Sequence, residues 1–252
     1  MKARKPDMAL CGIWIAASLI LMMAAACSNR QGEGYIDQLL ALESTGFKGQ
    51  APKLSTVEDL KKAIEENRAE VEKKVTAAKN LGVYYKMIAL KYIDAGMYGL
   101  ALESLDKAID IFPENAQLFY YSAISSARLA KAEVAKPKEA AELFMQSEAF
   151  YKRALFLDPA YVDAMYGLAV LYAAELGLPE EAEPLVRNIL AREKKNVDVM
   201  FLLARILYQR ARPEEAIAVY DDILALNQPD KIKSQAQANR AQIEEELYGI
   251  GR

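Results

Sequence analysis

From residue 35 onward, apolar residues recur every three or four positions, which is the period of a helix that buries one face. A short pattern of this kind covers Tyr35–Glu43, and a loop containing glycine and proline follows over Ser44–Lys53. The next helix is predicted to begin at Ser55, because Ser55-Thr56-Val57-Glu58 has the form of a capping box. Residues 35–80 are therefore expected to form N-terminal helices. On one face of the second helix lie Val57, Leu60, Ile64, Val71, Val75 and Ala78.

The chain repeats itself after residue 82. Pro179-Glu180-Glu181-Ala182 recurs 34 residues later as Pro213-Glu214-Glu215-Ala216, and Pro137-Lys138-Glu139-Ala140 is a looser copy. A proline followed by acidic residues suits the first turn of a helix, where backbone amides are free and the helix dipole is positive. Each tetrapeptide therefore marks the start of the second helix in a repeating pair.

Four units with the same order of large and small residues align over residues 82–229. A small residue lies in the first helix of every unit, at Ala89, Ala123, Ala169 and Ala204, and large residues such as Tyr92, Tyr151 and Tyr172 lie nearby. This pattern resembles the tetratricopeptide repeat, whose period is 34 residues. The resemblance implies an all-α solenoid of stacked helical hairpins, in which each hairpin buries its apolar face against its neighbours.

Two units depart from this period. Pro113 and Pro159 close the first two units but are 46 residues apart, so the second unit carries about 12 extra residues around Arg128–Ala141. We expect this insert to lengthen both helices of the hairpin, and its tip to be either a harmless extension or a contact for a partner. The third unit has one extra residue before its second helix.

Because the ends of such a stack need polar-faced caps, residues 230–252 are expected to form a C-terminal capping helix and the helix at 55–80 to cover the other end.

The first thirty residues have the pattern of an export signal. Basic residues precede an apolar run from Met8 to Ala26, and Cys27 follows three alanines. This arrangement resembles a bacterial lipoprotein signal, although that family prefers leucine where Ala24 stands. The resemblance implies a signal peptide over 1–26, a diacylglyceride and a fatty acyl chain such as palmitate on Cys27, and a flexible tether over 27–34. An uncleaved membrane anchor and ordinary secretory cleavage are the alternatives for this segment.

Composition narrows the chemistry that the chain can carry. With 32 basic and 35 acidic residues among 252, the net charge of −3 gives no reason to expect a nucleic acid as partner. The absence of histidine excludes a Ser-His-Asp triad and any histidine-ligated metal. If the chain is processed as the lipoprotein resemblance implies, Cys11 leaves with the signal peptide and Cys27 carries the lipid. Neighbouring carboxylates such as Glu180 and Glu181 point to different faces of a helix and make poor acid–base pairs. We therefore expect no enzyme activity, no metal and no cofactor.

The resemblance to tetratricopeptide repeats also implies a binding surface, because the first helices of such repeats line a concave groove that binds peptides or protein segments. Tyr120, Tyr166 and Phe201 recur at one repeat position, either as an exposed aromatic ladder or as side chains that partly pack on neighbours. A clamp for a C-terminal carboxylate is not supported, since leucine and not asparagine follows Lys86 by four residues. By register the groove residues are Lys86, Leu90, Tyr120, Ile124, Tyr166, Val170, Phe201, Arg205 and Tyr208.

Two hypotheses of function follow from these patterns. The first is a non-catalytic scaffold for protein–protein interaction, tethered by its lipid in the bacterial cell envelope, with an envelope protein or a peptide segment in the groove. The outer membrane, on its periplasmic side, is favoured over the inner membrane because Ser28 follows Cys27. The alternative is an accessory subunit of an envelope transport system that handles a small ligand, which would need an enclosed pocket rather than an open groove.

Overall fold

The computed structural model describes residues 56–132 and 136–249, and every regular element in these residues is a helix. This confirms the predicted all-α fold. Contacts divide the chain into two compact units, Met1–Ala69 and Glu70–Arg252, and each is described by itself. The helices are α3 (Val57–Asp94), α4 (Tyr98–Ile111), α5 (Ala116–Ala132), α6 (Pro137–Leu157), α7 (Val162–Leu171), the π-helix η2 (Tyr172–Leu176), α8 (Pro179–Arg192), α9 (Val197–Gln209), α10 (Pro213–Ala225) and α11 (Asp230–Tyr248).

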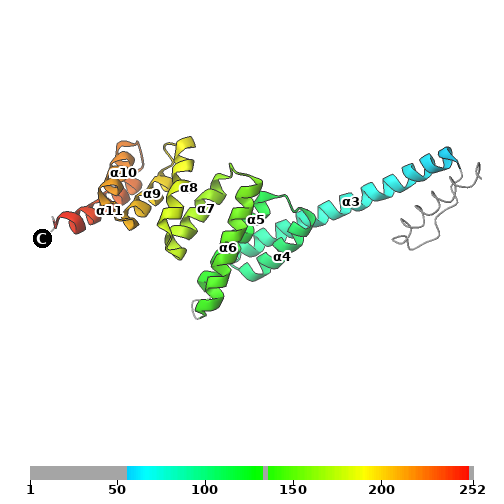
Figure 1. The fold of residues 1–252 in the computed structure, drawn as a ribbon, viewed down its shortest axis with the longest axis horizontal. Helices are drawn as coiled ribbons and strands as arrows, with labels where there is room; N and C mark the ends of the chain where they lie inside the picture. The colour runs from blue at the N-terminus through cyan, green and yellow to red at the C-terminus, as the bar shows by residue number, and fades with distance from the viewer. Residues whose placement is uncertain (1–55, 133–135, 250–252) are drawn as a thin grey trace, which may run out of the picture. The chain divides into compact units, whose positions relative to one another are not determined.

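The second unit consists of helical hairpins that follow one another along the chain (Figure 1). Each helix from α4 to α11 packs on the next helix in the sequence. The small residue predicted in the first helix of each repeat is fully buried in all four repeats, at Ala89, Ala123, Ala169 and Ala204. A methyl side chain lets neighbouring helices approach closely, so this alanine sets the spacing of the stack. The solenoid of hairpins is confirmed.

The hairpin of the second repeat is longer than those of the third and fourth repeats. Its helices α5 and α6 span 17 and 21 residues, whereas α9 and α10 of the fourth repeat span 13 each. Small polar residues hold the two long helices together. The Ser147 hydroxyl donates to the Ala123 carbonyl at 2.8 Å, and the Ser126 hydroxyl donates to Gln146 at 3.1 Å. The extra residues therefore extend both helices, and the hairpin tip at 133–135 lies outside the described residues.

The extra residue of the third repeat produces the π-helix. η2 continues directly from α7 over five residues, and Gly177 then ends it with a left-handed φ of 64°. A π-turn holds one more residue than an α-turn, so it absorbs an insertion without shifting the helix that follows. The same left-handed conformation recurs at Gly96 and, with φ 54°, at Ala211, two residues before the second helix of their repeats. The turn between the two helices of a repeat thus keeps a left-handed residue at the same place, whether that residue is glycine or alanine.

The N-terminal region differs from the sequence expectation. The sequence predicted a helix ending near residue 80 and a separate first repeat from residue 82, but α3 is one helix of 38 residues. Its apolar face was expected to cover the end of the stack. Instead Val57, Leu60 and Ile64 in the first unit are 47–62% exposed, and Val71 and Val75 in the second unit are exposed as well. The spacing revealed a helix face correctly but could not show whether anything packs on it.

The other end of the described chain is closed by α11. Ala236 and Ile243 of this helix are buried, Ile232 is half-buried, and Leu247 is 37% exposed. Gly249 ends the helix in a left-handed conformation. The predicted signal peptide, tether, Cys27 and the helix at 35–43 lie outside the described residues. Among the helices that the structure describes, none is long and apolar enough to cross a membrane.

Candidate binding groove

The first helices of three successive repeats carry the predicted aromatic position. Tyr120 lies on α5, Tyr166 on α7 and Phe201 on α9, and each side chain is half-buried. Their neighbourhoods differ. Tyr120 packs among other tyrosines, with its ring centroid 5.1 Å from Tyr161 and 6.3 Å from Tyr151. This ring therefore contributes mainly to packing, and burial raises the pKa of its hydroxyl.

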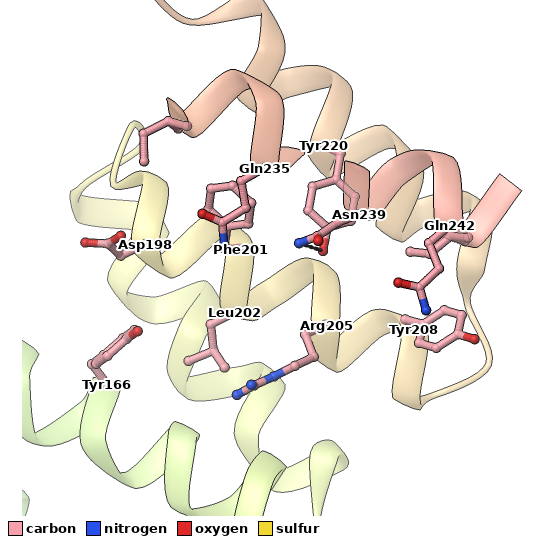
Figure 2. A pocket seen from close by; sticks show the side chains of 12 residues that line it. Tyr166, Asp198, Phe201, Leu202, Arg205, Tyr208, Tyr220, Gln235, Asn239 and Gln242 are labelled. Carbon is pink, nitrogen blue, oxygen red and sulfur yellow. Dashed lines mark hydrogen bonds between the residues drawn. The ribbon is translucent and has the colours of Figure 1, made fainter. Parts of the chain in front are cut away.

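Tyr166 and Phe201 instead line a pocket of about 490 Å³ near the C-terminal end of the stack (Figure 2). Arg205 and Tyr208, from the same α9 helix as Phe201, also line it. The pocket thus brings together four of the nine residues predicted from register. Its remaining lining residues come from α9, α10 and α11: Asp198, Leu202, Tyr220, Ile232, Gln235, Asn239, Gln242 and Ile243.

The capping helix contributes polar groups that the sequence analysis did not assign to the site. Gln235, Asn239 and Gln242 follow one another at intervals of four and three residues, so they share a face of α11. That spacing was available in the sequence, but the same pattern is typical of a solvated helix face. Only the packing of α11 on α10 turns this face toward Phe201 and Arg205, as Figure 2 shows.

The aromatic walls of the pocket are uncharged, and its tyrosines can form hydrogen bonds. Phe201 and Tyr220 meet edge to face with ring centroids 5.8 Å apart, and the Asn239 amide donates to the Tyr220 hydroxyl at 3.3 Å. Burial raises the pKa of Tyr166 and of Tyr220 above the ordinary tyrosine value. In both cases the charge of Arg205 opposes this rise. The phenols therefore stay protonated at neutral pH and can both donate and accept hydrogen bonds.

Arg205 is the cation of the pocket. It is exposed, extends from α9 into the opening (Figure 2), and forms no ion pair within the described part of the chain. Tyr208 lies further along α9 and donates its hydroxyl to Glu246 of α11, which raises the pKa of Tyr208. An arginine between aromatic rings and amide groups can pair with a carboxylate while an apolar side chain rests on the rings.

The other five predicted groove residues lie outside this pocket. The Lys86 ammonium donates to the Gln117 side chain, which links α3 to α5. Leu90 is half-buried on α3. Ile124 and Val170 are half-buried and pack against the main core. Like Tyr120, these residues lie on the first helices of the repeats, toward the N-terminal end of the second unit. None of them lines the pocket.

A buried carboxylate fixes the turn that follows α9. Glu183 of α8 is 5% exposed and accepts hydrogen bonds from three arginines. The Arg187 Nε lies 2.7 Å from Oε1, the Arg212 Nη1 lies 2.9 Å from Oε2, and Arg210 binds the same oxygen. Burial by itself would raise the pKa of Glu183, but these hydrogen bonds outweigh it and hold the pKa below the ordinary value. Because Arg210 and Arg212 flank Ala211, the cluster sets where α10 begins.

The comparisons with known proteins agree with this architecture. Residues 173–242 match the family model described as tetratricopeptide repeat. The solved structure of TTC0263, a thermophilic tetratricopeptide-repeat protein of Thermus thermophilus, aligns at 18% identity and TM-score 0.53, over 74% of this chain and 87% of that one. YrrB, described as a tetratricopeptide-repeat protein with an unusual peptide-binding site, aligns at 18% identity and TM-score 0.52, over 74% and 82%.

A third solved structure is MamA, from residue 41 to its end, of Desulfovibrio magneticus RS-1. It aligns at 14% identity and TM-score 0.52, over 68% of this chain and 98% of that one. No curated protein matches the chain in sequence. The described helices therefore form a tetratricopeptide-repeat solenoid. Solenoids of this class present extended binding surfaces to partner proteins.

Across residues 56–132 and 136–249, no group of three or more acidic, cysteine or histidine side chains is placed to hold a metal ion. The most strongly buried carboxylate, Glu183, is saturated by arginines rather than poised in a cleft. The described repeats have the fold of a tetratricopeptide-repeat solenoid, and the aromatic pocket beside α11 is one of its concave sites.

Proposed function

We propose that the chain is a non-catalytic scaffold, lipid-tethered in the bacterial cell envelope, that binds a segment of an envelope protein in the pocket between α9 and α11. The observation that carries this proposal is Arg205, a cation without an ion partner in the described residues, set between aromatic and amide side chains. An arginine in such a place is available to a carboxylate from outside. The peptide-binding site of YrrB, a protein of similar fold, supports the same kind of ligand.

The ligand that fits is a peptide segment with an apolar residue close to an acidic one. The apolar side chain would lie against Phe201 and Tyr220, whose rings meet at 5.8 Å. The acidic group would reach Arg205, and the amide of Asn239 would bind the peptide backbone. Ligand selection then depends on one ion pair, a few hydrogen bonds and one apolar contact.

A photoreactive residue in the pocket tests this function. Benzoylphenylalanine replaces Gln242 in the full chain, and cells are illuminated before membrane proteins are solubilised. We expect a covalent adduct with a distinct envelope protein, reduced at least about tenfold by Arg205→Glu, because a reversed charge repels the carboxylate. Arg192→Glu, at an exposed arginine of α8 away from the pocket, is the matched control and should leave the adduct unchanged. A pocket that yields no protein adduct, or an adduct indifferent to Arg205→Glu, would contradict the proposal.

The volume of the pocket favours a second candidate, the transport accessory. About 490 Å³ falls within the range of sites for small molecules. Native mass spectrometry of the purified chain distinguishes the two functions. A small molecule that is retained by the wild type and lost on Phe201→Ala supports the accessory, whereas a protein adduct at Gln242 supports the scaffold.

The membrane tether rests on the sequence at Cys27. We propose that this cysteine carries the lipid and that the mature chain begins there, with the outer membrane as its location. Cys27→Ala should leave unprocessed precursor and abolish labelling by radioactive palmitate in growing cells. Labelling that persists in this variant would exclude Cys27 as the lipid site.

A further inference from the structure

A tyrosine in the core of the second repeat has a hydroxyl without a hydrogen-bond partner. Tyr151 of α6 is 5% exposed. Its hydroxyl forms no hydrogen bond in the part of the chain that the structure describes, and it is not among the side-chain polar atoms there that are sealed from solvent. A polar atom at this depth usually has a partner, because burial removes most of its hydration. The Tyr151 hydroxyl is therefore available to a group from outside.

The fourth repeat shows which side of the stack this hydroxyl faces. Tyr220 has the repeat position of Tyr151, is 4% exposed and lines the pocket beside α11. There the Asn239 amide donates to the Tyr220 hydroxyl at 3.3 Å, and the ring of Phe201 lies 5.8 Å away (Figure 2). Tyr151 has the same relation to Tyr120, with ring centroids 6.3 Å apart. By this correspondence the Tyr151 hydroxyl faces the side of the stack on which the pocket lies.

A glycine on the next repeat leaves the end of the Tyr151 ring uncovered. A Cβ atom on Gly167 of α7 would lie 2.5 Å from the Tyr151 hydroxyl oxygen, so a side chain there would displace the ring. The other repeats have large residues at this position: Met87, Tyr121 and Leu202. A residue of that size would also cover the hydroxyl. Gly167 thus gives the phenol both its space and its access to solvent.

The charged group that acts on Tyr151 is an arginine. Arg128 lies eight residues after Tyr120 on α5, is exposed, and forms no ion pair within residues 56–132 and 136–249. Burial raises the pKa of Tyr151, and the charge of Arg128 opposes this rise. Asp163 of α7 instead adds to the effect of burial on the pKa of Tyr120 and of Tyr161. At neutral pH the site therefore offers a neutral O–H donor beside a cation.

We propose that Tyr151 and Arg128 form a second anchoring point for the partner segment, which places an acidic side chain where α5, α6 and α7 meet. The phenol would donate to one carboxylate oxygen, and the guanidinium would pair with the same group. A carboxylate satisfies both the free donor and the cation, whereas an apolar or basic side chain satisfies neither. This inference rests on the proposed function, because it adds a contact to the same bound segment. It gives that segment two acidic residues, one at Arg205 and one at Arg128.

Photo-crosslinking at the second anchoring point tests this contact. Benzoylphenylalanine replaces Asp163, an exposed residue four positions before Gly167, in the full chain, and cells are illuminated before membrane proteins are solubilised. We expect an adduct with the envelope protein, and Tyr151→Phe and Arg128→Gln should each reduce it at least about tenfold, the scale of one hydrogen bond to a charged group. Arg192→Gln, at an exposed arginine of α8, is the matched control and should leave the adduct unchanged.

The stability of Tyr151→Phe separates a binding role from a structural one. Because the Tyr151 hydroxyl has no partner in the described chain, its removal should leave the urea midpoint of unfolding unchanged. Tyr172→Phe is the control, since the equally buried Tyr172 donates its hydroxyl to Glu148 at 2.9 Å. That variant should lower the urea midpoint and leave the adduct at position 163 unchanged.

The results distinguish this anchoring point from the pocket beside α11. An adduct at position 163 that resists both Tyr151→Phe and Arg128→Gln, or a lower urea midpoint in Tyr151→Phe, would overturn the anchoring point. An adduct at Gln242 with none at position 163 would overturn it too, and would leave the proposed function standing. An adduct at position 163 that both variants weaken, with none at Gln242, would support the anchoring point and contradict the pocket. No adduct at either position would contradict both.

Discussion

At the scale of single residues, the Glu183 cluster shows how a charge can be built into an otherwise apolar repeat. The sequence pattern assigned no role to this glutamate, which lies two residues after Glu181 near the start of α8. The structure buries it under three arginines, two of which come from the turn before α10. A buried carboxylate with that many donors is stabilised as an ion, and its role is to join two repeats.

Glu183→Gln is predicted to lower the free energy of unfolding by about 2 kcal/mol at pH 7, the scale of hydrogen bonds to a charged group. The pKa of Glu183 is depressed in the folded state, so its contribution is complete above the unfolded pKa of about 4.3 and is lost as pH falls through the folded pKa. The difference between wild type and variant, measured by urea unfolding, should therefore shrink between pH 6 and pH 3.

Glu180→Gln, at an exposed glutamate of the same helix, is the control and should change stability by less than about 0.5 kcal/mol. A Glu183→Gln variant as stable as the wild type at neutral pH would show that the arginine cluster is dispensable. A difference between them that grew on acidification would contradict the direction of the pKa shift.

At the scale of elements, the π-helix η2 explains how the third repeat tolerates one extra residue. The five-residue turn follows α7 without a break, and the backbone amide of Leu178 reaches back to the Tyr172 carbonyl at 2.9 Å. The side chain of Glu175 in η2 also pairs with Lys131 of α5 at 2.6 Å. The insertion is thus absorbed locally, and α8 begins in the same relation to its repeat as α10 does.

Deletion of Ala174, an exposed residue of η2, is predicted to convert the π-turn into α-helix and to leave the fold intact. We expect the free energy of unfolding to change by less than about 1 kcal/mol, because no core residue is lost. The helix α9 has no extra residue, so deletion of Gln209 should shift Arg210 and Arg212 away from Glu183. This deletion should lower the free energy of unfolding several times more than deletion of Ala174 does. Thermal unfolding followed by circular dichroism compares the two deletions, and equal losses would show that η2 holds no spare residue.

At the scale of the whole molecule, the described repeats behave as a linear stack in which each hairpin depends on its neighbours. The C-terminal end is closed by α11, whose Ala236 and Ile243 are buried. Among residues 56–132 and 136–249 no comparable helix covers the N-terminal end, where Tyr84 and Ile88 are exposed. The two ends of the described repeats therefore differ, and only the C-terminal end carries the pocket beside α11.

Removal of residues 230–252 is predicted to destabilise the last repeat by about 3 kcal/mol or more, because it uncovers the apolar face of α10. Hydrogen exchange by mass spectrometry should show faster exchange in α9 and α10, while α5 and α6 keep their protection. The same deletion removes the α11 wall of the pocket, including Asn239 and Gln242. Uniform loss of protection through all repeats would contradict a stack with local dependence.

The sequence by itself determined the repeat. The recurring alanines, the Pro-Glu-Glu-Ala starts and the 34-residue period depend on local helix chemistry, so they predicted the hairpins, the lengthened second repeat and the place of Tyr166, Phe201, Arg205 and Tyr208 on one surface. Only the tertiary structure decided which faces are covered, because a helical period reveals an apolar or polar face without naming its neighbour. It packed Tyr120 among tyrosines, turned the polar face of α11 into a pocket wall, buried Glu183 and left Tyr84 and Ile88 of α3 exposed.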